Sequence, residues 1–180
     1  MSKITVWRDG HPETPERVTE NAADIAAVLQ TIGVTFERWP TRTLPGDATP
    51  AAVLAAYADE IARLSRAGGY TSADVIRLAT GAPNTDSMRQ KFLDEHIHAE
   101  DEVRFFVEGS GAFYLHAGGK VHQCICATGD LIGVPANTPH WFDMGPTPAF
   151  TAIRLFTNPE GWVAQFTGDA IARRFPLYAS

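Results

Sequence analysis

The chain has 180 residues, of which 44% are hydrophobic and 20% are charged, and its formal net charge is -6. This composition is ordinary for a soluble globular protein, and the length favours a single domain, residues 1–180, that buries roughly 70% of the surface of the unfolded chain. The negative charge argues against a nucleic-acid backbone or an anionic membrane as partner, although local arginines and a cation can still attract a small anion.

The first half of the chain is predicted to be mostly helical, because its apolar residues recur at helical spacing. The predicted elements are a strand over residues 3–7, a helix over 21–33, a strand over 34–39, a helix over 50–68 and a short helix over 86–94. Thr49 can cap the long helix, Pro50 suits its first turn, and Gly68-Gly69 would end it. Residues 72–79 remain ambiguous between helix and strand.

From about residue 95 onward, short runs of strand formers alternate with glycine-containing turns. The predicted strands cover residues 103–108, 112–116, 121–126, 130–134, 140–144 and 150–156, with turns at 109–111, 117–119, 128–130 and 145–146, and a short helix is expected over 170–174. Short, evenly spaced strands with such turns are typical of an antiparallel sandwich or barrel. We therefore predict a mainly β, α+β fold, with a barrel core over about residues 95–156 and the helices packed outside it.

Targeting signals and cysteines bear on the compartment. No run reaches the roughly 18 apolar residues of a membrane span, and the start, MSKITVWRDGHPETP, lacks an apolar signal-peptide core. We expect a cytoplasmic protein that is a monomer or a weak oligomer. Cys124 and Cys126 would share one strand face, where a disulfide fits poorly, so we predict packed thiols in a reducing compartment. A Cys-x-Cys metal pair is the alternative, and it lacks further cysteines.

The string DEHIHAEDEVRFFVEG carries the main candidate site. Side chains two apart on a strand share a face, so we expect His96, His98, Glu102 and Arg104 to point the same way. Two imidazoles and a carboxylate on one face predict a metal site. His140, which follows the turn-rich string GVPANTP, is the expected fourth ligand.

Three imidazoles and one carboxylate would leave two positions of an octahedral divalent cation open. These positions suit a substrate that chelates through two oxygens, or a substrate oxygen together with dioxygen. The ligands suit iron, nickel, manganese or cobalt, whereas a closed structural zinc site usually recruits several thiolates. The alternative interpretation is a surface strand whose solvated histidines lie beside the acidic residues Glu100, Asp101 and Glu102.

Two spacings in this region resemble the motifs of the cupin superfamily. H-x-H-x3-E-x6-G, which begins at His96, resembles the first motif, and G-x5-P-x-N-x2-H, which ends at His140, resembles the second. Met144 stands where the second motif often has asparagine. The strings FLDEHIHAEDEVRFFVEGSG, DLIGVPANTPHWFDMG, FTAIRLFTNPEGWVAQFTGD and GVTFERW further resemble the acireductone dioxygenase family of methionine salvage, and this resemblance covers most of the chain.

The family resemblance implies a cupin-type β-barrel, or jelly roll, in which His96, His98, Glu102 and His140 bind one Fe2+ or Ni2+ ion. It implies oxidative cleavage of the enediol acireductone (1,2-dihydroxy-3-keto-5-methylthiopentene) by O2. The iron form would give 4-methylthio-2-oxobutanoate and formate, and the nickel form 3-methylthiopropanoate, formate and CO. The cupin motifs alone also permit another small-molecule dioxygenase, a sugar isomerase, or a non-catalytic cupin that binds a metabolite.

Two arginines near the ligands have alternative interpretations. Arg104 lies one pleat beyond Glu102, so it either clamps an enediolate oxygen or forms a buried salt bridge. Arg154, in the apolar string FTAIRLF, raises the same question.

Aromatic residues near the ligands are more often core than pocket wall. The resemblance implies that Phe92, Phe142 and Trp162 surround the substrate side chain. Glu95, beside the first ligand, is expected either to support a histidine or move a proton, or to be a solvated surface carboxylate. His116 has no partner at ligand spacing and is assigned no role.

Overall fold

The protein is described here from a computed structural model, which covers residues 1–158 and 162–179. The strands are β1 (Lys3–Arg8), β2 (Arg17–Thr19), β3 (Thr35–Arg38), β4 (Ser72–Leu78), β5 (His96–Ile97), β6 (Glu102–Ala117), β7 (Lys120–Ala127), β8 (Asp130–Val134), β9 (His140–Asp143), β10 (Phe150–Phe156) and β11 (Gln165–Phe166). The helices are α1 (Ala22–Gln30), α2 (Pro50–Ala56), α3 (Ala58–Gly68), α4 (Thr85–Phe92) and the 3-10 helix η1 (Ile171–Arg174). None of the described helices has both the length and the apolar content that a bilayer crossing requires.

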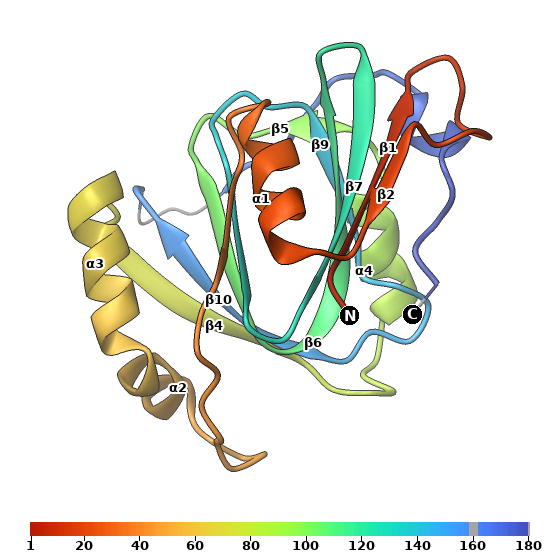
Figure 1. Cartoon of the computed structure of the whole chain (residues 1–180). Helices are drawn as coiled ribbons and strands as arrows, with labels where there is room; N and C mark the ends of the chain where they lie inside the picture. The colour runs from red at the N-terminus through yellow and green to blue at the C-terminus, as the bar shows by residue number, and fades with distance from the viewer. Residues whose placement is uncertain (159–161, 180) are drawn as a thin grey trace.

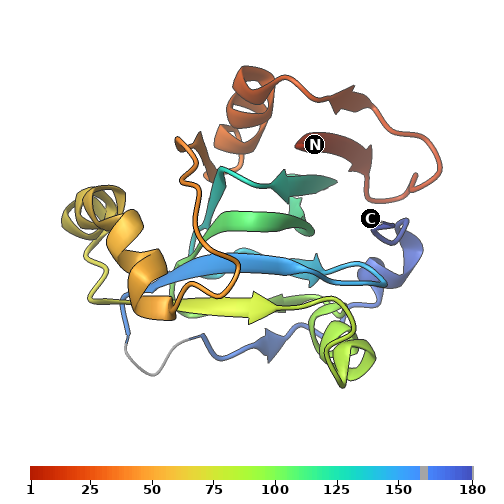
Figure 2. The ribbon, with the colours of Figure 1, turned by 90° about the horizontal axis from the view of Figure 1, so that it is seen from below.

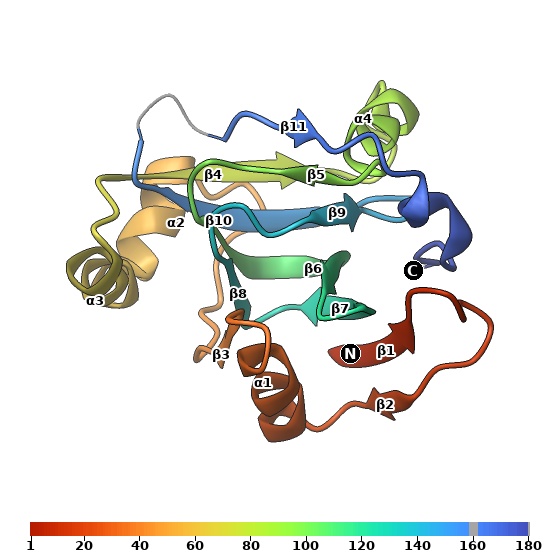
Figure 3. The ribbon, with the colours of Figure 1, turned by 90° about the horizontal axis from the view of Figure 1, so that it is seen from above.

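The strands form an antiparallel barrel that is organised around β6 (Figure 1). The first half of β6 pairs with β8 and β10, and β4 and β3 extend that side of the barrel. The second half of β6 pairs with β7 and β9, and β1, β2, β5 and β11 extend the other side. The helices lie outside the strands, as Figures 2 and 3 show from opposite directions. The predicted mainly β architecture with external helices is therefore confirmed.

The predicted turn at residues 109–111 is wrong, because β6 continues through it from one side of the barrel to the other. Gly109 adopts a φ of 76°, and an added Cβ would lie 2.1 Å from the carbonyl oxygen of Ala149. The pairing with β10 also shifts register between Thr151 and Ala152. The residue of β6 that this shift skips is Val107, so a bulge lies two residues before Gly109, and both flanks keep their long-range hydrogen bonds.

The predicted helix over residues 50–68 is two helices, α2 and α3, which meet at Tyr57. Thr49 caps α2 as predicted, by accepting a hydrogen bond from the amide of Ala52. Tyr57 is fully buried beside Trp39 and Phe105, with ring centroids 6.5 and 4.8 Å away. The helix breaks there because burial of this ring outweighs the local helical preference of the surrounding residues.

Three hydrophobic clusters hold the barrel and its covering segments together. One fills the barrel beneath α1, the second lies under α2 and α3, and the third lies under the C-terminal segment that includes η1. Cys124 and Cys126 lie in the first cluster as free, buried thiols with their sulfur atoms 3.8 Å apart, which confirms that they are packed. The ambiguous stretch over residues 72–79 forms strand β4, because it finds a partner in β10.

Candidate metal centre

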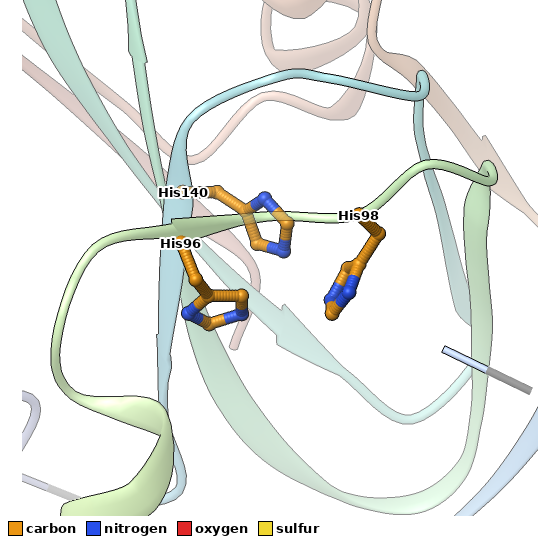
Figure 4. Close-up of side chains that lie close together, drawn as sticks. All are labelled: His96, His98 and His140. Atoms are coloured by element: carbon orange, nitrogen blue, oxygen red, sulfur yellow. The ribbon is translucent and has the colours of Figure 1, made fainter. Parts of the chain in front are cut away.

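Three histidine side chains gather at one end of the barrel (Figure 4). One ligand nitrogen from each of His96, His98 and His140 lies within 4.8 Å of the other two, and all three residues are buried. The backbone brings them together because His96 on β5 is paired directly with His140 on β9. Glu102 adds a buried carboxylate, whose Oε2 lies 3.1 Å from His98 Nε2 and 3.0 Å from His140 Nε2. The structure therefore brings all four predicted ligands together.

The expected arrangement of these residues on a single strand is wrong, although their convergence is right. β5 ends at Ile97, His98 lies in the connection that follows, and Glu102 begins β6. The amide of Asn137 donates to the carbonyl of His98 over 2.8 Å, which ties this connection to the loop that precedes His140. The side chains thus meet through a loop and two paired strands rather than through the alternation of one strand.

Each of the three imidazoles is held by a backbone carbonyl at its Nδ1 atom. The acceptors are Asp94 for His96 at 2.8 Å, Val163 for His98 at 3.0 Å and Thr138 for His140 at 2.7 Å. A carbonyl can only accept, so Nδ1 carries a proton, and in the neutral imidazole the Nε2 lone pair is available to a cation. Outer hydrogen bonds of this kind orient metal-binding histidines. The donor set therefore fits a divalent cation of the first transition series.

The electrostatics favour the cation-binding forms of His96 and Glu102, whereas His98 holds a proton more strongly. Burial and the neighbouring His140 lower the pKa of His96 to about 4, so its imidazole is neutral near pH 7. Burial alone would raise the pKa of Glu102, but Arg104 and His140 hold it well below its usual range, so the carboxylate stays ionised. Burial also lowers the pKa of His98, yet its hydrogen bond to Glu102 outweighs this and raises it. A cation competes with that proton for the same lone pair.

A cavity of about 380 Å³ opens beside the ligands. The predicted aromatic residues Phe92, Phe142 and Trp162 all line it. Phe142 is buried, whereas Phe92, at the end of α4, is 37% exposed. Trp162 is fixed by its Nε1–H, which donates to the Asp101 carbonyl over 3.0 Å. Sequence reasoning did not single out the further lining residues Asp74, Ile76, Met88, Met144, Phe150, Phe156 and Ala164.

Arg104 forms the buried salt bridge that was one of its two predicted roles, and it also lines the cavity. Its Nη2 donates to Glu102 Oε1 over 2.9 Å, so it forms a buried salt bridge with a predicted ligand. It also lines the cavity, and its guanidinium carbon lies 4.5 Å from the Phe142 ring centroid and 5.7 Å from that of Trp162. Its buried Nε has no hydrogen-bond partner among the described residues. One donor of this arginine is therefore left for an acceptor that the described residues do not supply.

Arg154 reaches the same cavity but is already paired. It lies opposite Arg104 in the register between β10 and β6, and its Nε and Nη2 donate to the two carboxylate oxygens of Asp74 over 2.8 and 2.6 Å. Its guanidinium carbon also lies 5.6 Å from the Trp162 ring centroid. Arg154 is therefore a salt-bridged residue of the cavity wall.

Glu95 does not lie on the surface, so the solvated alternative is wrong. It is 3% exposed, its Oε2 lies 2.6 Å from His116 Nδ1, and its Oε1 accepts from the Thr167 hydroxyl over 2.7 Å. The histidine that it contacts is His116 rather than one of the predicted ligands. Sequence spacing had no signal for this pair, because the two residues lie 21 positions apart and meet only across strands.

Known proteins resemble this chain over its whole length. The model of the ARD/ARD' family matches residues 3–164. An acireductone dioxygenase from Marinobacter nauticus is 53% identical over 180 residues, which cover 100% of this chain and 97% of that relative. One from Parvibaculum lavamentivorans is 55% identical over 181 residues, which cover 100% of this chain and 98% of the relative. The solved structure of acireductone dioxygenase from Bacillus anthracis with cadmium ion in active center matches with a TM-score of 0.82 and 35% identity, covering 92% of this chain and 98% of that one.

These matches agree with the buried histidine cluster and with the antiparallel barrel that holds it. The expected cupin-type fold is therefore confirmed, and so is the expectation of an enzyme. The chain belongs to the acireductone dioxygenase family.

Proposed function

We propose that the enzyme cleaves 1,2-dihydroxy-3-keto-5-methylthiopentene with O2 at this site, and that the resident metal selects the products. With Fe2+ these are 4-methylthio-2-oxobutanoate and formate, and with Ni2+ they are 3-methylthiopropanoate, formate and CO. The observation that supports this most directly is that the buried His96, His98 and Glu102 line a cavity together with Arg104, and that the buried His140 contacts Glu102. The relative from Bacillus anthracis contains a cadmium ion in its active center, which supports a metal at the corresponding place.

The four ligand residues would hold one ion per chain. When bound, the ion supplies Lewis acidity and a template for a chelating enediol. The carbonyl contacts at Nδ1 keep the three imidazoles aimed at one point, so little reorganisation is needed. Because the same residues suit iron and nickel, the metal is set by loading rather than by ligand identity.

Arg104 would bind the anionic end of the substrate. Its unpartnered Nε–H is buried beside the ligands, and a charge-assisted hydrogen bond in such surroundings is strong. Phe92, Phe142 and Trp162 would enclose the methylthio side chain and exclude water. Arg154, neutralised by Asp74, would close the wall behind Trp162 rather than add a second free cation.

The test is to strip the metal with a chelator, reload separate samples with Fe2+ and Ni2+, and analyse oxygen uptake and products. We expect oxygen consumption with both metals and two different product sets. Identical products would contradict the metal-directed part of the proposal. Substrate conversion without oxygen uptake would indicate an isomerase, and binding without conversion a non-catalytic cupin.

We further propose that residues 1–180 form one domain that works in the cytoplasm as a monomer or a weak oligomer. The helical first half supports this, because α1 packs Ile25, Val28 and Leu29 into the same cluster that fills the barrel. Light scattering during size-exclusion chromatography tests the assembly state.

A further inference from the structure

A chain of polar contacts lies behind the metal centre and runs through His116, near the end of β6. His116 Nδ1 lies 2.6 Å from Glu95 Oε2, and His116 Nε2 lies 3.1 Å from Asp9 Oδ2. We infer that His116 is a positioning residue, which ties together the two separate segments that deliver His96 and His140. This inference rests on the metal site proposed above.

The first tie is to the segment that carries His96. Glu95 directly precedes this ligand, and both of its carboxylate oxygens are engaged, one by His116 and the other by the Thr167 hydroxyl. The backbone amide of Thr167 also donates to the Glu95 carbonyl over 3.1 Å. Glu95 is only 3% exposed, so removing the imidazole would leave one oxygen of a buried carboxylate without its partner.

The second tie is to the segment that carries His140. The backbone amide of His116 donates to the carbonyl of Pro139 over 2.9 Å, and the preceding residue, Leu115, is paired with His140 in the sheet. One residue therefore contacts both Glu95 and Pro139, each of which directly precedes a ligand. Asp9, beyond the end of β1, anchors the other side of the imidazole ring.

The charges favour this arrangement. Burial alone would lower the pKa of His116, but its hydrogen bonds to Asp9 and Glu95 outweigh burial and raise it. An imidazole held between two carboxylates donates from both nitrogens when it is protonated, which fixes the orientation of its ring. Ligand geometry depends on such outer contacts, whose loss typically weakens metal binding by about 10–100-fold.

The test compares two amide substitutions of His116. In His116→Asn the side-chain amide can occupy the position of Nδ1 and still donate to Glu95. In His116→Gln the amide reaches toward Asp9 and leaves Glu95 without a donor. The matched control is His122→Gln, because His122 is also a strand histidine, although more deeply buried than His116, and its Nδ1 contacts only the Leu115 carbonyl among the described residues, at 3.3 Å.

Two measurements are made on each folded variant and on the wild type. The Ni2+ affinity is measured by competition with a chelator, and the absorption spectrum is recorded on the cobalt-loaded protein. We expect His116→Gln to bind Ni2+ about 10-fold more weakly and to shift the cobalt spectrum. His116→Asn and His122→Gln should stay close to the wild type in both measurements.

Wild-type affinity and an unchanged cobalt spectrum in His116→Gln would overturn the inference, and so would equal losses in His116→Asn and His116→Gln. If His116→Gln does not fold, Thr167→Val carries the test, because it frees the other Glu95 oxygen. Weakened binding there supports the inference, and unchanged binding overturns it. Failure of the wild type to bind any metal would instead refute the proposed function, so the two failures are distinguishable.

Discussion

The two halves of β6 present opposite chemistry to the interior of the same barrel. Before Gly109, the inward side chains near the metal centre are Glu102 and Arg104, a charged pair at the wall of a cavity. After Gly109, Phe113 and Leu115 point inward and are fully buried in the hydrophobic cluster. The charged half therefore serves the site, while the apolar half fills the barrel.

The two halves also depend on each other. The Arg104 guanidinium carbon lies 5.2 Å from the Phe113 ring centroid, so a side chain of the apolar half packs beside the charged pair. Low polarity there strengthens the attraction between Glu102 and Arg104, but it also makes either charge costly without its partner. In β6, the interior charges thus lie where they pair with each other and face the cavity.

The largest effect is expected from loss of a ligand, in His140→Ala. Metal content should collapse and turnover should disappear, and the loss in affinity should exceed the roughly 10–100-fold cost of losing an outer contact. Metal analysis of the purified variant measures this, with circular dichroism to show that it remains folded. A folded variant with full metal content would remove His140 from the ligand set.

The second largest effect is expected at Arg104, the buried cation that pairs with Glu102. Arg104→Ala should keep the metal but lower turnover by roughly 100-fold or more, because loss of a preorganised donor typically costs this much. Steady-state kinetics on metal-matched samples measure the change. Wild-type turnover would show that the salt bridge to Glu102 is the whole role of this arginine.

The apolar half should respond in stability rather than in chemistry. Phe113→Ala removes a fully buried ring and is expected to lower the free energy of unfolding by about 3–5 kcal/mol, while the folded protein still binds metal. Denaturant titration followed by metal analysis separates the two effects. A loss of metal with little loss of stability would contradict the division between the halves.

The close contact at Gly109, where the two halves of β6 meet, can be tested with two glycines. Gly109→Ala should destabilise the protein by more than about 1 kcal/mol, because Gly109 has a positive φ and the new Cβ would collide with the Ala149 carbonyl oxygen. Gly118→Ala is the matched control, since its φ is also positive, at 62°, but nothing lies within 4 Å of the added Cβ. Equal losses in the two variants would show that the close contact at Gly109 has no effect of its own.

The smallest effect is a pH dependence from His116. Its pKa is raised in the folded protein, so its contribution to stability is fully present below about pH 6.5, the usual value for an unfolded histidine. That contribution is lost as the pH rises through the folded value. As the pH rises above about 6.5, the urea midpoint of unfolding should therefore fall more for the wild type than for His116→Gln. Parallel curves would exclude this source of pH dependence.

Local sequence was enough to predict which four side chains gather at the candidate site, and also the class of fold. His96, His98 and Glu102 lie within seven residues of one another, and His140 follows a turn, so their spacing alone indicates a shared site. The strand formers and glycine turns of the second half predict an antiparallel barrel for the same reason, because alternation and turn chemistry are local properties.

Only the tertiary structure decided where contacts with residues distant in sequence outweigh local preferences for a turn or a helix. The glycines near position 109 indicate a turn by themselves, yet β6 continues because β10 and β7 pair with its two halves. Tyr57 ends a helix because its ring is buried against residues far away in the chain. Glu95 meets His116, and Asp74 meets Arg154 from 80 positions away, across paired or curved strands. Such contacts depend on which strands become neighbours, and burial and long-range hydrogen bonding set that choice.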